Sequence, residues 1–157
     1  DYPAPGVIDT IRDVFVANQL DVNSSPSSLA CTCTPHALEW GNITHEKDVL
    51  SLLPGSKSGY DLCLVAEPLW QDTFPCHSEL AHSISAMVGN EGGYALLSFC
   101  HRPNNIHVPE RDLSFFQTAR ENHGLQSECI LSVKGEYSDV QVTDGTRIDV
   151  HLYKLWK

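Results

Sequence analysis

The segment YDLCLVAEPLW (residues 60–70) is an almost unbroken run of apolar residues that ends in an acid, a proline and a tryptophan. Such a run, without polar alternation, is typical of a strand in a parallel sheet that is covered on both faces. A second run, YALLSFC (residues 94–100), has the same character. The helix predicted between them has an apolar stripe of Leu80, Ile84, Met87 and Val88. Asp72 or Thr73 is its expected N-cap.

Upstream of this unit, the sequence predicts a helix and a strand joined by a loop. Residues 5–18 have apolar side chains at helical spacing. Those side chains are Ile8, Ile11 and Phe15. A Ser/Pro-rich stretch at residues 20–30 indicates a loop. CTCTPHALEWG (residues 31–41) is compatible with a strand that ends at Trp40 and Gly41.

Downstream, residues 110–123 predict a helix that Gly124 closes as a C-cap. ECILSVK (128–134) and RIDVHLYKLW (147–156) are the last predicted strands, and their alternation suits an antiparallel pair. Strands that alternate with helices imply a doubly wound α/β sheet with right-handed crossovers. We therefore expect one α/β domain over residues 1–157.

Ligands of doubly wound sheets bind at the carboxyl ends of the strands. Three groups of residues follow directly on predicted strands: Trp40-Gly41, Ala66-Glu67-Pro68 and Cys100-His101. We expect them to meet at one edge of the sheet.

Composition narrows the class of partner and the compartment. The chain carries 20 acidic and 10 basic residues, a formal net charge of −10. This balance argues against nucleic acid and suits a cationic ligand or a basic peptide. No apolar run approaches the ~18 residues that a membrane span needs, and no signal-peptide pattern is visible. We expect a cytoplasmic protein without a membrane partner.

The six cysteines allow two interpretations. Cys63 and Cys100 lie inside apolar strand-like runs, which favours reduced thiols that pack as small hydrophobic side chains. Asn23 and Asn42 begin formal glycosylation sequons, so a secreted domain with disulfides is the alternative.

A second cluster of chemically active residues is CHSELAH (residues 76–82). Glu79 and His82 are i, i+3 neighbours on a helix, as in carboxylate metal sites. His77 and His82 are five residues apart and point to different sides, so we expect a solvated helix face rather than a metal site. GNEGG (residues 89–93) follows a helix and indicates a turn, not a phosphate-binding loop.

Five stretches resemble, in order and spacing, the seven-stranded S-adenosylmethionine-dependent methyltransferases of the lysine and nicotinamide N-methyltransferase-like group. DYPAPGVIDTIRDVFVAN (1–18) resembles the Asp-Tyr-Pro segment after the second strand, and LEWG (38–41) the Trp-Gly of the third. Residues 60–70 resemble the fourth strand. GGYALLSFCHRP (92–103) and RDLSFFQTARENHGL (111–125) resemble the fifth strand and its helix in the elongation factor 1-alpha N-terminal and lysine methyltransferase branch.

The resemblance covers the C-terminal portion of that family. The family's first strand, glycine-rich loop, first helix and second strand precede the Asp-Tyr-Pro segment. The implied fold is a Rossmann-like doubly wound sheet that lacks its first strand and glycine-rich loop and ends in an antiparallel strand pair. Because the family's first strand lies mid-sheet, we expect exposed apolar edges and no activity from the isolated chain.

The resemblance also implies S-adenosyl-L-methionine as cofactor and assigns residues to it. Asp1 would accept hydrogen bonds from the ribose, as the acid after a dinucleotide-binding loop does. Trp40 would lie against the adenine, although a place in the core is its alternative. Ala66 would line the cofactor near its methionine moiety.

Glu67 stands where many relatives carry Asp after the fourth strand. As the candidate catalytic residue, it would hold the cationic end of the cofactor or orient an incoming amine; the alternative is an acid that faces water. Trp70 and His101 are the candidates for the substrate channel, and packing under the following helix is the alternative for Trp70.

The implied reaction is transfer of a methyl group to nitrogen, with a basic protein such as a translation factor as the expected substrate. A lysine with a pKa of ~10.4 needs desolvation to lose its proton, whereas an α-amine with a pKa near ~7.7–8.0 is already partly neutral. The acceptor therefore stays open between lysine and an N-terminal amine. A nicotinamide-type small molecule as acceptor, and an inactive protein-binding module, are the alternatives.

Overall fold

The structure is a computed structural model that describes residues 6–18, 33–69, 71–100, 108–136 and 147–157. Its elements in chain order are α1 (Val7–Ala17), α2 (Ile43–Leu50), β1 (Leu62–Ala66), a 3-10 helix η1 (Gln71–Cys76), α3 (His77–Met87), β2 (Tyr94–Cys100), α4 (Val108–His123), β3 (Gln126–Glu136) and β4 (Arg147–Trp156).

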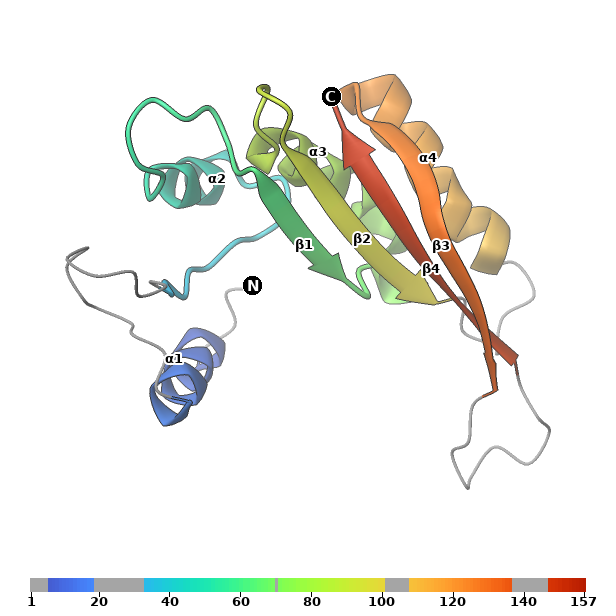
Figure 1. The fold of residues 1–157 in the computed structure, drawn as a ribbon, viewed down its shortest axis with the longest axis horizontal. Helices are drawn as coiled ribbons and strands as arrows, with labels where there is room; N and C mark the ends of the chain where they lie inside the picture. Colours follow the sequence, from blue (N-terminus) through green and yellow to red (C-terminus); the bar gives the residue numbers. More distant parts are fainter. Residues whose placement is uncertain (1–5, 19–32, 70, 101–107, 137–146) are drawn as a thin grey trace.

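The strands form one mixed four-stranded sheet in the order β1-β2-β4-β3 (Figure 1). β1 and β2 pair in parallel, with α3 in the connection between them. β4 runs antiparallel to both β2 and β3. The predicted α/β class, the parallel pair and the antiparallel C-terminal pair are therefore confirmed.

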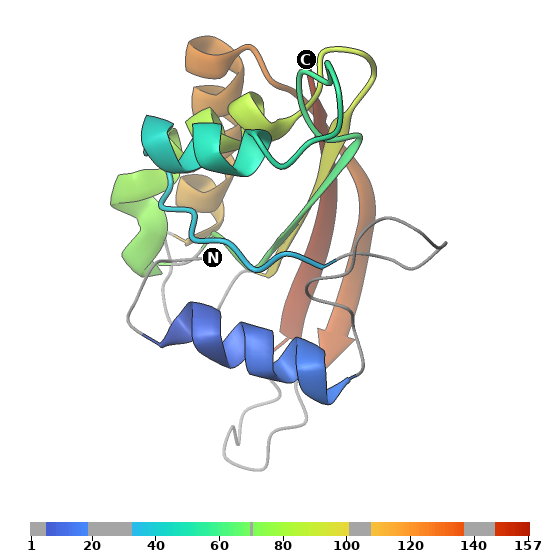
Figure 2. The same cartoon turned by 90° about the vertical axis from the view of Figure 1, so that its left-hand side faces the viewer.

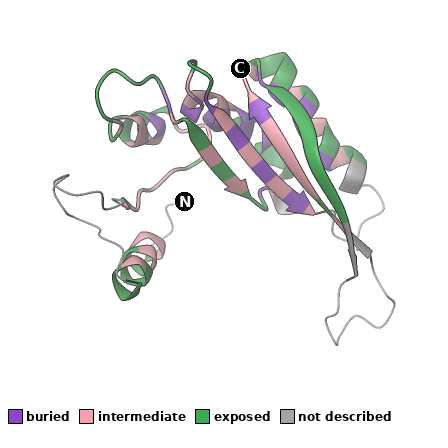
Figure 3. Cartoon of the chain, in the orientation of Figure 1, coloured by how far each residue is buried: buried purple, intermediate pink, exposed green. Residues whose placement is uncertain are grey.

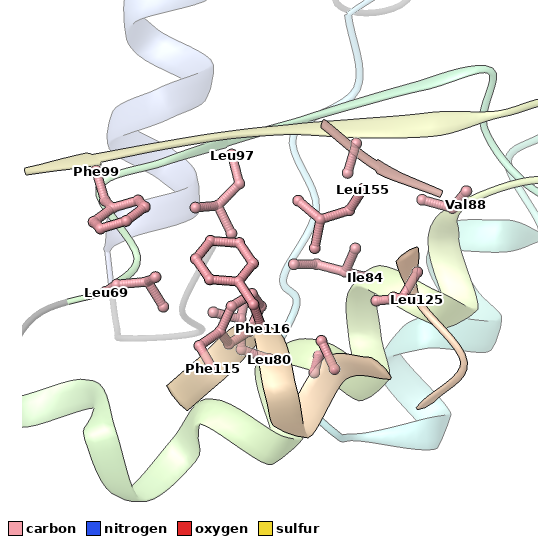
Figure 4. Close-up of a cluster of buried hydrophobic side chains, with 13 residues drawn as sticks. Leu69, Leu80, Ile84, Val88, Leu97, Phe99, Phe115, Phe116, Leu125 and Leu155 are labelled. Carbon is pink, nitrogen blue, oxygen red and sulfur yellow. The ribbon is translucent and has the colours of Figure 1, made fainter. Parts of the chain in front are cut away.

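Helices α3 and α4 cover one face of this sheet (Figures 1 and 2). Their apolar side chains pack against the inward residues of β2 and β4 (Figure 4). The largest buried members are Leu80 and Ile84 of α3, Phe115 and Phe116 of α4, Leu97 and Phe99 of β2, and Leu155 of β4. Full burial of one such side chain contributes about 1.5–3 kcal/mol, so this layer is the core that holds the strand ends in place.

The opposite face of the sheet is not covered by any element of the described chain (Figure 2). Along β1 the burial pattern alternates: Cys63 and Val65 pack against the core, whereas Leu62 and Leu64 are exposed (Figure 3). The prediction that this strand is covered on both faces is therefore wrong for the described residues. β1 is an end strand of the described sheet, and Leu64 on its uncovered face is 75% exposed.

The expected strand before Trp40 is a second correction, because residues 33–39 form no strand and residues 40 and 41 form a turn. The chain instead enters α2, which sequence reasoning did not predict. Asn42 is its N-cap, and the side-chain oxygen accepts hydrogen bonds from the backbone N–H groups of Thr44 and His45. A capped helix start satisfies donors that would otherwise lack partners.

The helix after β1 also begins later than predicted. Residues 71–76 form η1 with Pro75 inside it, and α3 starts only at His77. Thr73, an expected N-cap, instead donates its hydroxyl to the carbonyl of Pro68 at 2.7 Å. At the far end of α4 the prediction holds: Gly124 has a φ of 69°, the left-handed conformation of a C-cap.

The GNEGG stretch forms the predicted turn between α3 and β2. Its backbone lies against the segment before β1: the N–H of Gly89 donates to the carbonyl of Tyr60 at 3.1 Å. A Cβ at Gly93 would lie 2.5 Å from that same carbonyl oxygen, closer than any side chain allows. The glycines thus permit a close crossing of backbones, which fixes where β1 and β2 begin.

Candidate functional site at the carboxyl edge of β1 and β2

The two parallel strands β1 and β2 end side by side, at the edge where ligands of doubly wound sheets bind. Ala66 is in register with Ser98. One residue later, the N–H of Glu67 donates to the carbonyl of Ser98 at 2.8 Å. The first residue after β1 is therefore still tied to β2, and its side chain starts from a fixed backbone position.

Glu67 has a φ of 50°, and it is the one non-glycine residue with a positive φ in the described part of the chain. For an L-residue, the left-handed region costs roughly 1–2 kcal/mol. Because Glu67 precedes Pro68, an extended φ near −120° would be favoured there. Backbone strain of this kind clusters at ligand-binding and catalytic sites, so Glu67 is the strongest local indication of function.

The turn that contains Glu67 is fixed by the residues that follow it. Pro68 is buried, and Leu69 is 1% exposed within the core cluster. The Thr73 hydroxyl bonds to the Pro68 carbonyl. Burial and hydrogen bonding therefore fix the conformation of the turn, as a preorganised site requires.

The carboxylate of Glu67 meets a side chain from the end of β2. The thiol of Cys100 donates to Oε2 of Glu67 at 3.4 Å. Glu67 is exposed and Cys100 is half-buried, so the carboxylate faces solvent with the thiol beside it. An ionised carboxylate accepts hydrogen bonds only, so this pair can hold a cation or a protonated amine at the sheet edge.

The structure brings two of the three predicted strand ends together. Ala66 and Glu67 are exposed at the same edge as Cys100. Trp40 is partly buried and packs against the core cluster, in agreement with the alternative of a place in the core. The N–H of the following Gly41 donates to the hydroxyl of Ser83 on α3 at 2.8 Å, so that segment is tied to a helix and does not continue a strand.

Three predicted site residues, Asp1, Trp70 and His101, lie outside the described residues. Their roles at the ribose and in the acceptor channel stay predictions, as does contact between Trp40 and adenine.

Sequence reasoning missed a buried polar network between α2 and α3. Glu46 is 4% exposed, and its Oε1 accepts a hydrogen bond from the Ser83 hydroxyl at 2.6 Å. Its other oxygen lies 3.3 Å from Nε2 of His82. Ser83 also accepts from the N–H of Gly41, so it links Glu46 to the turn after Trp40. The N-cap signal of Asn42 could have predicted α2, and with it the position of Glu46.

The predicted solvated helix face at residues 76–82 is wrong for one member. His77 is 4% exposed, and its ring makes edge contacts with Phe74 and Phe115 at 5.4 and 5.7 Å between centroids. Burial lowers the pKa of His77; Asp112 opposes this effect and Arg111 adds to it. The cause is that η1 turns the start of α3 toward α4. Within the described ranges, no group of three or more His, Cys, Asp or Glu side chains could hold a metal ion.

The cysteine chemistry fits the prediction of small packed thiols at Cys63. Cys63 packs against the core cluster and has no disulfide, and burial raises the pKa of its thiol to about 11. Cys76 and Cys129 also have free thiols and are exposed. The Asn42 side chain, at one of the sequons, caps α2 and donates to Glu39 at 2.9 Å. Cys31 and Asn23 lie outside the described residues, so the alternative of a glycosylated domain with disulfides stays a prediction.

In the described ranges, no helix has both the length and the apolar character that a membrane crossing demands. No protein-family model matches the chain. No curated protein matches it either. Function is therefore inferred from the geometry of the carboxyl edge together with the resemblance of the sequence segments.

Proposed function

We propose that this chain is a methyltransferase module that acts with S-adenosyl-L-methionine on a nitrogen acceptor, and that Glu67 is its principal polar group. The observation that carries the proposal is the φ of 50° at Glu67, at the end of a parallel strand and next to Cys100. The resemblance assigns β1 and β2 to consecutive strands of the methyltransferase sheet, and their parallel pairing agrees with that assignment.

The described residues fit the charged part of this cofactor. Its sulfonium carries a positive charge, and the Glu67 carboxylate is exposed at the point where parallel strands end. Ala66 is exposed beside it, and its small side chain allows close approach. When bound, S-adenosylmethionine supplies the activated methyl group; the role of this chain is to align the donor and the acceptor.

The acceptor amine must lose a proton before it attacks the methyl group, because only the neutral nitrogen has a free electron pair. An N-terminal α-amine, with a pKa near ~7.7–8.0, loses it readily, whereas lysine at ~10.4 requires desolvation. The net charge of −10 favours a basic protein as substrate. We place the protein in the cytoplasm, and expect the isolated chain to bind ligand without turnover.

Calorimetry with S-adenosylmethionine and S-adenosylhomocysteine tests this proposal. Glu67→Gln should weaken binding of S-adenosylmethionine by about 5–10-fold, equivalent to ~1–1.4 kcal/mol. Binding of S-adenosylhomocysteine should change less, because its sulfur carries no charge. Glu91→Gln is the matched control, since Glu91 is exposed in the turn at the opposite end of β2 and should leave both affinities unchanged. Absence of binding by either ligand, or an unaltered Glu67→Gln variant, would contradict the proposal.

The uncovered sheet face favours a second candidate, a catalytically inactive relative that binds another polypeptide. Exposed apolar area such as that around Leu64 marks interaction surfaces. The same calorimetry separates the two functions, because the inactive module would bind neither nucleoside ligand.

A further inference from the structure

Two basic side chains have buried polar atoms at the point where helices α3 and α4 begin. His77 is the first residue of α3 and is 4% exposed, and neither of its ring nitrogens has a hydrogen-bond partner in the described ranges. Arg111 is near the start of α4, and its Nε and Nη2 are buried without a hydrogen-bond partner among the same residues. Buried donors are nearly always hydrogen-bonded, and an unsatisfied one points to a bound ion or another molecule.

These two side chains belong to one cluster, because both contact the same phenylalanine. The ring centroid of His77 lies 5.4 Å from that of Phe74, and Cζ of Arg111 also lies 5.4 Å from the Phe74 centroid. Burial lowers the pKa of His77, Asp112 opposes this effect and Arg111 adds to it, so both charged groups act on the ring. Phe74 belongs to η1, which is hydrogen-bonded to the turn that contains Glu67. The cluster therefore adjoins the carboxyl edge of β1 and β2.

The charges around the cluster favour a monoanion. α3 and α4 both begin on the side of the sheet where β1 and β2 end (Figure 1), and each helix start has about half an elementary positive charge. Arg111 adds one positive charge, and the carboxylate of Asp112, which is 0% exposed, adds one negative charge. The remaining excess is about one positive charge. The acids of the first helical turns, Glu79 and Glu110, are exposed, so solvent screens them.

We propose that this cluster binds a carboxylate, held by the Nε–Nη2 edge of Arg111 with His77 as a further donor. That edge of a guanidinium has two parallel N–H groups, which match the two oxygens of a carboxylate. The segment that joins β2 to α4, residues 101–107, contains no acidic residue that could supply one. The site needs no nucleoside cofactor, so the proposal holds whether or not the chain transfers methyl groups.

NMR of the ¹⁵N-labelled chain, recorded on the arginine Nε–H signals, tests binding directly. When acetate replaces chloride at constant ionic strength, the Arg111 signal should shift and that of Arg120 should not. Arg120 is the matched control because it is exposed on the same helix. Arg111→Lys keeps the charge but has no fork, so it should raise the dissociation constant of acetate about 10-fold. Arg120→Lys should leave that constant unchanged.

A second titration identifies the source of the carboxylate. The probe is a short peptide with blocked ends and one glutamate as its only charged residue. Tighter binding of this peptide than of acetate would assign the site to an acidic side chain of another polypeptide. Equal affinities would assign it to a free small carboxylate. Both results support the site, whereas an Arg111 signal that neither probe moves overturns it.

Urea unfolding in Tris chloride separates a ligand site from a purely structural role. Arg111→Met removes a charge whose polar atoms are buried without a partner, so the urea midpoint should rise. Acetate should raise the midpoint of the wild type but not that of Arg111→Met. Asp72→Asn tests a partner within the chain, because Asp72 belongs to η1, and it should leave the acetate effect unchanged. Equal losses of stability in Arg111→Met and Asp72→Asn, without an acetate effect, would overturn the proposal.

Discussion

Replacing Glu67 by glycine should make the fold more stable than replacing it by alanine. Both substitutions remove the carboxylate and its contact with Cys100, so this loss cancels in the comparison. What remains is the backbone, which holds residue 67 at a φ of 50°. Glycine adopts that conformation without a steric penalty, whereas alanine keeps the strain of the native residue.

The magnitude follows from two opposing effects. A left-handed conformation costs a residue with a Cβ roughly 1–2 kcal/mol. Glycine loses more backbone entropy on folding than alanine, which costs about 0.5–1 kcal/mol. The Glu67→Gly variant should therefore be more stable than the Glu67→Ala variant by about 1 kcal/mol, or by about 2–4 °C in melting temperature for a chain of this size.

Urea unfolding followed by tryptophan fluorescence measures the difference. Ala66→Gly is the control at the neighbouring position. Ala66 is the last residue of β1, so the same exchange of alanine for glycine should lower the free energy of unfolding by about 1 kcal/mol there. Opposite signs at positions 66 and 67 are the expected result. If the glycine variant at position 67 were no more stable than the alanine variant, Glu67 would be unstrained and the argument for function from its backbone would fail.

Two further predictions concern buried polar groups. Ser83→Ala removes the hydroxyl that bonds Gly41 and the buried Glu46, so it should reduce the free energy of unfolding by about 2–4 kcal/mol. The control Ser51→Ala loses only an exposed hydrogen bond and should reduce it by less than ~0.5 kcal/mol. Equal losses of the two variants in urea titrations would contradict the role of the network. Because burial lowers the pKa of His77, the folded state binds its proton less tightly than the unfolded state. Stability should therefore be greatest above the ordinary pKa of ~6.5 and fall as the pH drops through the folded pKa. His77→Leu should flatten the dependence of the urea midpoint between about pH 7 and pH 5, and an unchanged slope would show that His77 does not cause it.

The sequence predicted those elements whose signals are local and unambiguous. The apolar runs of β1 and β2 and the Gly124 C-cap were of this kind. Residues 33–39 were not, because a short segment before Trp40 can have the same pattern whether it forms a strand or packs as irregular chain against a core. Asn42 was interpreted as a sequon, although the same residue is a strong N-cap.

The candidate site was predicted in position but not in its most informative property. The strand-end rule pointed to Ala66 and Glu67, and the parallel pairing with β2 brought Cys100 to them. Nothing in the letters Ala-Glu-Pro indicates a positive φ, because that conformation usually belongs to glycine or asparagine. It depends on tertiary contacts, namely the bond to Ser98 and the burial of Leu69, which no local pattern shows.

The proposed function requires that the carboxyl edge of β1 and β2 binds a ligand. Two-dimensional NMR of the ¹⁵N-labelled chain, titrated with S-adenosylhomocysteine, tests it most directly. We expect the amide signals of Ala66, Glu67 and Cys100 to shift with ligand concentration, while those of residues 89–93 at the opposite edge stay fixed. Signals at 66, 67 and 100 that do not move at saturating ligand, or shifts confined to other parts of the chain, would contradict it.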